Sequence, residues 1–224
     1  NMGFPKAGTT TLHEFFKCAN LNSSHTICKE SGPCAMCMRN ASASGKPPLA
    51  TCGKHFDAHS QLDFNNPYRD RCYFPQIELL EEFHKEAPQA TFMLMFRPMD
   101  HWLDSLTKWH DLNYRLAMCH ITGFPKGVGK KREELQQWFC QHVTRIRKFV
   151  QDHPSHVLIE INVEDTNVTG PIMDALFYTD IVTKRHPQQQ QNKYPNSSDT
   201  TTSCWGHYNQ NSKILGALAK IKAL

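Results

Sequence analysis

Apolar residues recur along the chain with two different periods, which divide it into alternating helices and strands. Helical spacing predicts four longer helices, over residues 9–19, 75–86, 98–115 and 132–152. Continuous apolar runs predict strands buried on both faces, at residues 91–96 and 156–161. Two shorter helices are expected at residues 170–178 and 211–224. Because strands and helices alternate, the pattern predicts an α/β fold: a three-layer parallel sheet with helices on both faces.

Two segments interrupt this alternation. Residues 31–75 are rich in Gly, Pro, Ser and Cys and show little periodicity, so we expect a long, disulfide-stapled insertion rather than a packed layer. Residues 187–203 are of low complexity and predict a mobile loop. The 224 residues therefore predict a single domain, 1–224, that carries these two segments.

Composition and charge exclude several classes of protein. Hydrophobic residues make up 39% of the chain and aromatic residues 10%, which is enough for a core and excludes wholesale disorder. The net charge of +4 is too small to predict a nucleic-acid binder, but it suits an anionic ligand held at one local site. The longest apolar run, residues 92–96, is far shorter than the roughly 20 residues of a membrane span. No membrane span is therefore predicted within this chain.

The nine cysteines indicate an oxidising compartment, and five of them crowd into residues 28–72. Four glycosylation sequons, which begin at Asn22, Asn40, Asn167 and Asn196, give modest support. Disulfides are the expected state of the cysteines, with free thiols as one alternative. A zinc site is the other alternative, with these candidate ligands: Cys34 and Cys37, joined by Cys28, Cys52, His55 or His59. Because the number of cysteines is odd, at least one thiol stays unpaired within the chain.

The candidate chemistry begins at residues 3–12, GFPKAGTTTL. A glycine-bearing loop that runs directly into a helix presents backbone N–H groups and the positive helix end to an anion. Lys6 adds a cation, and Thr9 and Thr10 add hydroxyl donors; a plain turn with a Thr N-cap is the alternative. Nucleotide triphosphatases place the lysine after the second glycine and end a later strand in aspartate, whereas the apolar run here ends at Arg97. Neither ATP hydrolysis nor a metal ligand is therefore expected.

Residues 5–12, PKAGTTTL, resemble the 5′-phosphosulfate loop of sulfotransferases that use 3′-phosphoadenosine 5′-phosphosulfate (PAPS). A second signature of that family is a strand that ends in Arg, followed by Ser on the next helix; Arg97 and Ser105 match it. A guanidinium and a hydroxyl at such a turn also form an anion pocket on physical grounds, although Arg97 in an ordinary surface ion pair is the alternative. The resemblance covers residues 3–17, 72–115 and 149–178, and it is closer to the lumenal carbohydrate sulfotransferases than to the cytosolic ones.

The resemblance implies a P-loop nucleotide-binding fold of the sulfotransferase type, with PAPS as the donor and no metal. In the family, the Arg and Ser of the second signature bind the 3′-phosphate, and a loop closes over the nucleotide where this chain has residues 204–209. The residues expected to bind the donor are Lys6, Ala7, Gly8, Thr9, Thr10, Thr11, Arg97, Ser105, Trp205 and Gly206. The family also has a full strand before the loop, of which residues 1–4 are the only part here. A targeting or anchor segment is therefore expected upstream.

Sulfuryl transfer, as this family performs it, is an in-line displacement onto an acceptor hydroxyl or amine. It requires a cation for the leaving phosphate, a base for the acceptor proton and the exclusion of water. Lys6 is the expected cation. Glu30 is the expected base, because lumenal members carry an acidic residue at a similar interval after the loop lysine; a solvated loop carboxylate is the alternative. The other candidates for the base are His55, His59, Asp57 and Asp63.

A carbohydrate hydroxyl is the expected acceptor, and the secretory pathway, specifically the Golgi lumen, is the expected location. The Cys-rich insertion and residues 116–131 would select the acceptor. Basic residues that either meet an acidic glycan or form a solvated surface are Lys126, Lys130, Lys131, Arg132, Arg145, Arg147 and Lys148. Trp109 and Tyr114 are candidates for stacking on a sugar, although helical spacing favours a core position for Trp109. The competing functions are a nucleotide or sugar kinase, and a non-catalytic glycan-binding protein with a degenerate nucleotide loop.

Overall fold

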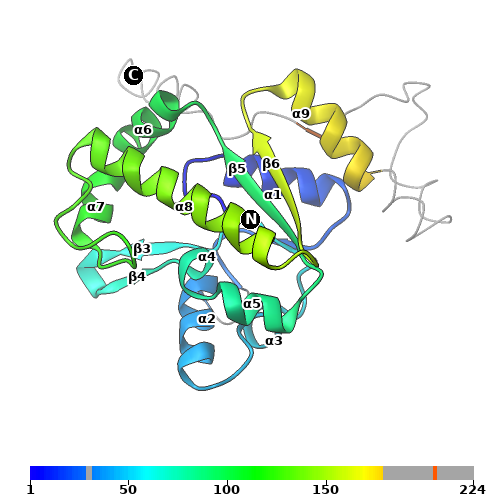
Figure 1. The fold of residues 1–224 in the computed structure, drawn as a ribbon, viewed down its shortest axis with the longest axis horizontal. Helices are drawn as coiled ribbons and strands as arrows, with labels where there is room; N and C mark the ends of the chain where they lie inside the picture. Colours follow the sequence, from blue (N-terminus) through cyan, green and yellow to red (C-terminus); the bar gives the residue numbers. More distant parts are fainter. Residues whose placement is uncertain (29–31, 179–203, 206–224) are drawn as a thin grey trace, which may run out of the picture.

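The structure is a computed structural model and describes residues 1–28, 32–178, 204 and 205 (Figure 1). The predicted mobile loop at 187–203 and the predicted helix at 211–224 lie outside these residues. Within the described ranges, no helix combines the length and the apolar character needed to span a membrane.

The strands form three two-stranded sheets in the described part of the chain. Strand β5, Thr91–Phe96, pairs in parallel with β6, Val157–Asn162, and β1, Ser23–Ser24, pairs in parallel with β2, Ala58–His59. The third pair, β3 (Phe64–Asn66) and β4 (Arg71–Tyr73), is an antiparallel hairpin. The α/β class and the parallel pairing are as predicted, but these separate sheets do not establish the single three-layer sheet.

Residues 1–4 lie between the two parallel pairs and connect them. On one side, the Met2 amide donates a hydrogen bond of 2.7 Å to the Met93 carbonyl of β5. On the other side, the Asn1 side-chain amide donates one of 2.8 Å to the Ser60 carbonyl, just after β2. The segment before the phosphate loop therefore occupies the position of a strand between β5 and β2, which places the loop at the carboxyl end of β5.

Two of the four predicted long helices form as single helices, and two are divided. Helix α1, Thr9–Cys18, and helix α8, Arg132–Asp152, match their predicted ranges closely. The range 75–86 contains α4, Pro75–Glu78, and α5, Leu80–Glu86, while the range 98–115 contains α6, Met99–Lys108, and α7, Leu112–Met118. His110 and Asp111, with φ of 47° and 50°, separate α6 from α7, because a right-handed helix does not continue through left-handed residues. Near the end of the described chain, α9, Thr166–Met173, runs into a π-helical turn over Asp174–Tyr178.

The core has two clusters, and β5 contributes to both because it is buried on both faces, as predicted. Met93 and Met95 belong to the cluster that contains Leu12 and Phe15 of α1. Phe92 and Leu94 belong to the other cluster, where Phe92 stacks on Phe149 of α8 at 5.9 Å between ring centroids. Figure 1 shows α8 running alongside β5 and β6. The strand is thus held between helices that pack on its alternate side chains.

The Cys-rich insertion is stapled by disulfides, as predicted, but it also packs against the core, which the sequence did not predict. It contains α2, Cys34–Ala43, α3, Pro48–Gly53, and a 3₁₀ turn at Pro67–Arg69. Met38 and Leu62 of the insertion share the second core cluster with Leu80 and Phe83 of α5. The apolar residues of the insertion are few and are divided between short helices and loops, so no regular spacing in the sequence predicted this packing.

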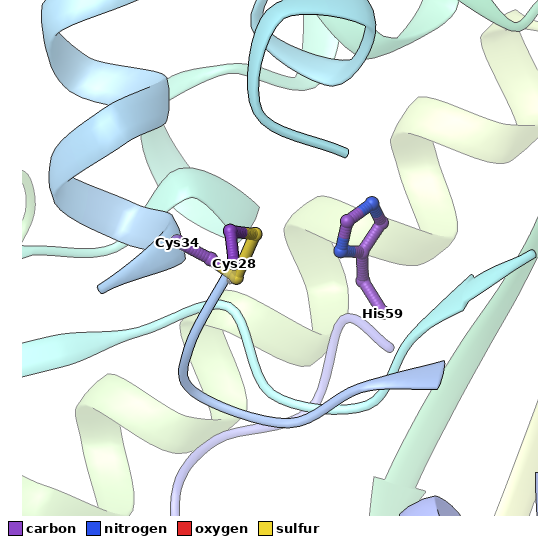
Figure 2. A group of neighbouring side chains, drawn as sticks. All are labelled: Cys28, Cys34 and His59. Atoms are coloured by element: carbon purple, nitrogen blue, oxygen red, sulfur yellow. A yellow bond between two sulfur atoms is a disulfide. The ribbon is translucent and has the colours of Figure 1, made fainter. Parts of the chain in front are cut away.

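Four disulfides confirm the predicted state of the cysteines. They join Cys18 to Cys204, Cys28 to Cys34, Cys37 to Cys52, and Cys72 to Cys119, and they leave Cys140 free and exposed. Figure 2 shows the nearest approach to the alternative zinc site, where Cys28, Cys34 and His59 place ligand atoms within 4.8 Å of one another. The two sulfur atoms there are bonded to each other, so neither is available as a thiolate ligand.

Candidate functional site

A cavity of about 740 Å³ opens where α1 begins and where β5 ends. It brings together residues from both segments that the sequence analysis singled out, although they lie some ninety positions apart along the chain. The predicted donor-binding residues that line it are Lys6, Gly8, Thr9, Thr10, Thr11, Arg97 and Ser105. The phosphate loop and the strand-to-helix turn therefore face one open cavity, of a size typical of small-molecule sites.

The loop that enters α1 is held close to the strands behind it. Gly8 has φ of 98°, a conformation that favours glycine, and a Cβ added there would lie 2.5 Å from a methyl carbon of Val163. At Gly3, an added Cβ would lie 2.5 Å from the Met95 carbonyl oxygen of β5. The indole of Trp102 on α6 donates a hydrogen bond of 3.0 Å to the Pro5 carbonyl and anchors the loop from the other side. The first turn of α1 therefore faces the cavity. The N-terminus of a helix attracts anions through its free backbone N–H groups.

Lys6 is a partly buried cation in this cavity. Its ammonium lies 3.7 Å from the centroid of the Trp109 ring, and it forms no ion pair with a described residue. Burial, and in second place the charge of Arg97, lower the pKa of Lys6 to about 8. Two cations that repel each other in one cavity favour the binding of a negative ligand, because it would relieve that repulsion.

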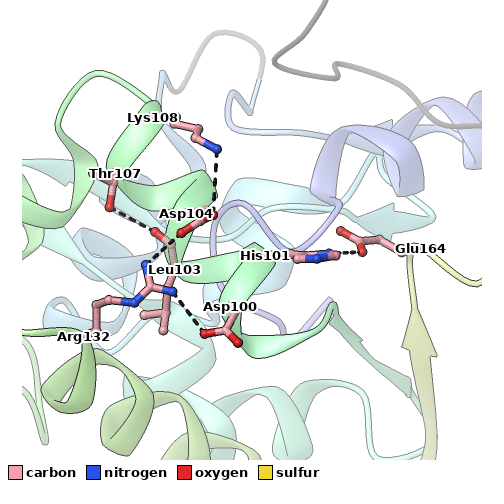
Figure 3. A network of polar contacts seen from close by, with 8 residues as sticks. All are labelled: Asp100, His101, Leu103, Asp104, Thr107, Lys108, Arg132 and Glu164. Atoms are coloured by element: carbon pink, nitrogen blue, oxygen red, sulfur yellow. Dashed lines mark hydrogen bonds and ion pairs between the residues drawn. The ribbon is translucent and has the colours of Figure 1, made fainter.

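Arg97 and Ser105 lie on the other wall of the cavity, at the end of β5 and on α6. Arg97 forms an ion pair with Glu164, in which Nε lies 3.3 Å from Oε1 without the alignment of a hydrogen bond. Glu164 is shared, because its second oxygen lies 2.6 Å from His101 Nδ1 (Figure 3). Ser105 is only 5% exposed. The ion pair suggested as the alternative for Arg97 does form, but it leaves guanidinium hydrogen-bond donors for a ligand.

Asp63 is the buried carboxylate of the cavity, and the sequence analysis ranked it among the last candidates for the base. It is 3% exposed, and burial raises its pKa to about 6. The Gln61 side-chain amide donates a hydrogen bond of 3.2 Å to Asp63 Oδ2. Such hydrogen bonds stabilise the carboxylate and offset part of the rise in its pKa. Oδ1 has no aligned hydrogen-bond partner within the described part of the chain. Its burial results from contacts with distant segments, so no local sequence signal marks it.

His25 also lines the cavity and was missed by the sequence analysis. Its Nε2 lies 3.2 Å from the Thr9 hydroxyl, which donates a hydrogen bond of 2.9 Å to Gln61 Oε1. Burial, followed by the neighbouring His13, lowers the pKa of His25 to about 4. His25 is therefore neutral near pH 7 and positions the Thr9 hydroxyl rather than adding charge.

Several residues that the sequence analysis proposed are placed elsewhere. Glu30 and Gly206 lie outside the described residues. Ala7 is fully buried with its amide bonded to the Phe4 carbonyl, and Trp205 packs on Phe15 of α1; neither lines the cavity. The other candidates for the base that do not line the cavity are His55, His59 and Asp57.

The residues proposed to contact a glycan also need revision. Trp109 was expected in the core, but it is half-buried at the core's edge and lines the cavity. Arg132, proposed to meet an acidic glycan, is bound to Asp100 and Asp104 of α6 (Figure 3). Arg147 and Lys148 are likewise engaged, by Glu160 and Asp152. These arginines and this lysine support the solvated-surface interpretation, because their charges are already paired.

A family model described as a sulfotransferase domain matches residues 1–176, which include both walls of the cavity. The search of curated proteins and the search of solved structures found no match. Because the family model covers more than half of the chain, this protein belongs to the sulfotransferase family, whose P-loop fold serves the transfer of sulfuryl groups.

Proposed function

We propose that the protein transfers a sulfuryl group from PAPS to a hydroxyl group of a carbohydrate. The observation that carries the proposal is the single cavity with two cationic walls, Lys6 at the start of α1 and Arg97 at the end of β5. PAPS has an anionic group at each end of its ribose, a phosphosulfate on the 5′ side and a phosphate on the 3′ side. Two separate anion sites in one cavity suit such a ligand better than a nucleotide with a single phosphate chain.

The residues present fit this donor. Lys6, Thr10 and the first turn of α1 would hold the phosphosulfate, and Arg97 with Ser105 would hold the 3′-phosphate. The ion pair between Arg97 and Glu164 uses Nε, and the guanidinium also carries Nη donors that could bind a phosphate, which supports the second site. The donor would supply the activated sulfuryl group and a nucleotide leaving group.

Lys6 would stabilise the negative charge that develops on the leaving phosphate. Its position at the helix start places an ammonium and several backbone amides on the same side of the cavity. The pKa of about 8 keeps the ammonium mostly protonated near pH 7. Its contact with the Trp109 ring is a weak one that a phosphate could replace.

Asp63 would accept the proton of the acceptor hydroxyl. Its support is a carboxylate inside the same cavity, with a pKa of about 6 that matches a general base working near neutral pH. Oδ1, which is buried and lacks an aligned partner among the described residues, would take the proton from an acceptor bound in the cavity. Glu30 remains the alternative predicted from the sequence, and the substitutions in the Discussion separate the two.

The carbohydrate acceptor and the secretory location rest on weaker support. Four disulfides are compatible with an oxidising compartment such as the Golgi lumen. The kinase alternative is disfavoured because Arg97 stands where those enzymes place a metal-binding aspartate after the strand. The glycan-binding alternative is disfavoured because Lys6, Arg97 and Ser105 all still face the cavity.

The experiment combines a binding measurement with an activity measurement. The product nucleotide, 3′-phosphoadenosine 5′-phosphate (PAP), should raise the unfolding temperature, and ATP with magnesium should not. A radiolabelled-sulfate assay with PAPS against glycans, phenols and steroids should then give transfer to a glycan. Stabilisation by ATP with magnesium but not by PAP would favour the kinase, and PAP binding without transfer to any acceptor would favour the binding protein.

Replacing Arg97 by alanine should weaken PAP binding by ~2–4 kcal/mol, the range for a desolvated charge pair. The physical reason is the loss of the guanidinium that would read the 3′-phosphate. Isothermal titration of PAP would measure the effect. Arg132→Ala is the matched control, because Arg132 is paired with Asp100 and Asp104 and does not line the cavity. Equal PAP affinity of Arg97→Ala and the parent protein would show that the second anion site lies elsewhere.

A further inference from the structure

A second hollow, of about 460 Å³, lies on the Cys-rich insertion and is lined by cations. Arg39 of α2, Lys46 after α2 and Arg71 of β4 contribute the charged side chains. Its lining contains no aspartate or glutamate, and Asn40, Ser44 and Thr51 add neutral polar groups. The hollow therefore combines positive charge with hydrogen-bonding side chains, a combination suited to an anionic, hydroxylated ligand.

These three cations are not neutralised by the protein. In the part of the chain that the structure describes, Arg39, Lys46 and Arg71 form no ion pair, whereas Arg132, Arg147 and Lys148 are all paired. Like charges gathered at one hollow repel one another, so the arrangement favours a negative ligand. The lining contains no aromatic residue on which bases could stack, which disfavours a single-stranded nucleic acid.

Disulfides hold the walls of this hollow in place. Cys37, which lines it, is bonded to Cys52 of α3, and the Cys28–Cys34 disulfide fixes the start of α2. Cys72, the neighbour of Arg71 on β4, is bonded to Cys119 at the end of α7. A hollow built on cross-linked segments is pre-organised, so a ligand would lose less free energy to ordering of the protein.

The hairpin β3–β4 links the hollow to the cavity of the proposed reaction. Asn65 of β3 lines that cavity, and the next residue, Asn66, is paired across the hairpin with Arg71. Paired residues on neighbouring strands lie about 5 Å apart, so the backbones of Asn65 and Arg71 are separated by less than roughly 10 Å. The two hollows therefore share this hairpin as a wall, and an oligosaccharide that occupied both would pass it.

We propose that Arg39, Lys46 and Arg71 form a subsite for a carboxylate- or sulfate-bearing unit of an acidic oligosaccharide. The reacting hydroxyl of the same oligosaccharide would lie in the cavity beside Asp63, on the other side of the hairpin. The proposal rests on the proposed function, since it names the class of acceptor: an acidic glycan rather than a neutral one. Lys6 and Arg97 of the reaction cavity are assigned to the donor. Of the other two cations that line it, Lys108 is paired with Asp104, and Arg115 donates hydrogen bonds to Asn65. The charge of the acceptor would therefore be met by a separate group of cations.

The test is a titration of PAP-loaded protein with an unsulfated chondroitin hexasaccharide, which carries three carboxylates. The triple variant Arg39→Ala, Lys46→Ala, Arg71→Ala should bind it roughly 10- to 100-fold more weakly, with a flatter dependence on salt. Its affinity for PAP should not change. The control removes the same charge from three exposed lysines that line neither hollow: Lys17→Ala, Lys54→Ala, Lys85→Ala. Uncharged chitohexaose should bind parent and variant equally weakly.

Glycosylation at Asn40 would place a sugar at the rim of this hollow, so all proteins should carry Asn40→Gln. If the alanine variant does not fold, the glutamine triple at the same positions keeps the side-chain volume and removes the charge.

Equal hexasaccharide affinity of parent and triple variant overturns the subsite, and so does an equal loss in the lysine control. If only the triple variant loses affinity for the hexasaccharide, and the parent protein transfers no sulfate to it, the subsite is supported. That result would also locate the failure in the proposed reaction.

Discussion

Replacing Lys6 by alanine should lower the rate of sulfuryl transfer by ~10²–10³-fold, the cost of removing one pre-organised donor to a developing negative charge. The ammonium lies at the start of α1, over the Trp109 ring, and no described acid neutralises it. The fold should survive, because the side chain is only partly buried and lies in the cavity rather than the core.

Single-turnover assays with radiolabelled PAPS would measure this change. Lys17→Ala, which removes an exposed lysine from the far end of α1, serves as the control and should retain full activity. Undiminished turnover by Lys6→Ala would remove Lys6 from the mechanism, while the fold and the cavity would stand.

Replacing Asp63 by asparagine should lower kcat by ~10²–10⁴-fold, the range for loss of a general base. Affinity for PAP should stay the same, because Asp63 is assigned to the acceptor rather than to the donor. The amide is nearly the same size as the carboxyl group, so the buried site should remain packed. Asp57→Asn is the control, since Asp57 lies in the same insertion but does not line the cavity.

Glu30→Gln distinguishes the two candidates for the base. If Glu30 is the base, its substitution lowers kcat by a similar factor and Asp63→Asn does not. A full loss of activity in both Glu30→Gln and Asp63→Asn would indicate that the two carboxylates act as a pair.

The pH dependence of kcat/KM should be bell-shaped, with limbs near pH 6 and pH 8. Asp63 must be deprotonated to act as base, and its pKa is raised to about 6, so the rate should rise as the pH rises through that value. Lys6 must be protonated, and its pKa is lowered to about 8, so the rate should fall as the pH rises through that value. Asp63→Asn should remove the acidic limb, and Lys6→Arg should move the basic limb upward. A flat profile in the parent protein would contradict both roles.

The sequence predicted those helices and strands whose positions follow from neighbouring residues alone. The range of α8 and the strand β5 were found because a helical period and a continuous apolar run are properties of neighbouring residues. The break between α6 and α7 was missed, since the left-handed conformations of His110 and Asp111 are not required by their residue types. The packing of the Cys-rich insertion was missed because it depends on disulfides and on contacts with α5.

The sequence by itself determined the family, and it predicted the two anion-binding segments, because a glycine loop before a helix and an arginine after a strand are local arrangements. Only the tertiary structure decided which charged groups share a space. It placed Lys6 and Arg97 on one cavity, buried Asp63 beside them, and gathered Arg39, Lys46 and Arg71 across the hairpin. The physical reason is that burial and charge environment depend on contacts between distant segments, and these set the pKa values and the unpaired charges on which the chemistry depends.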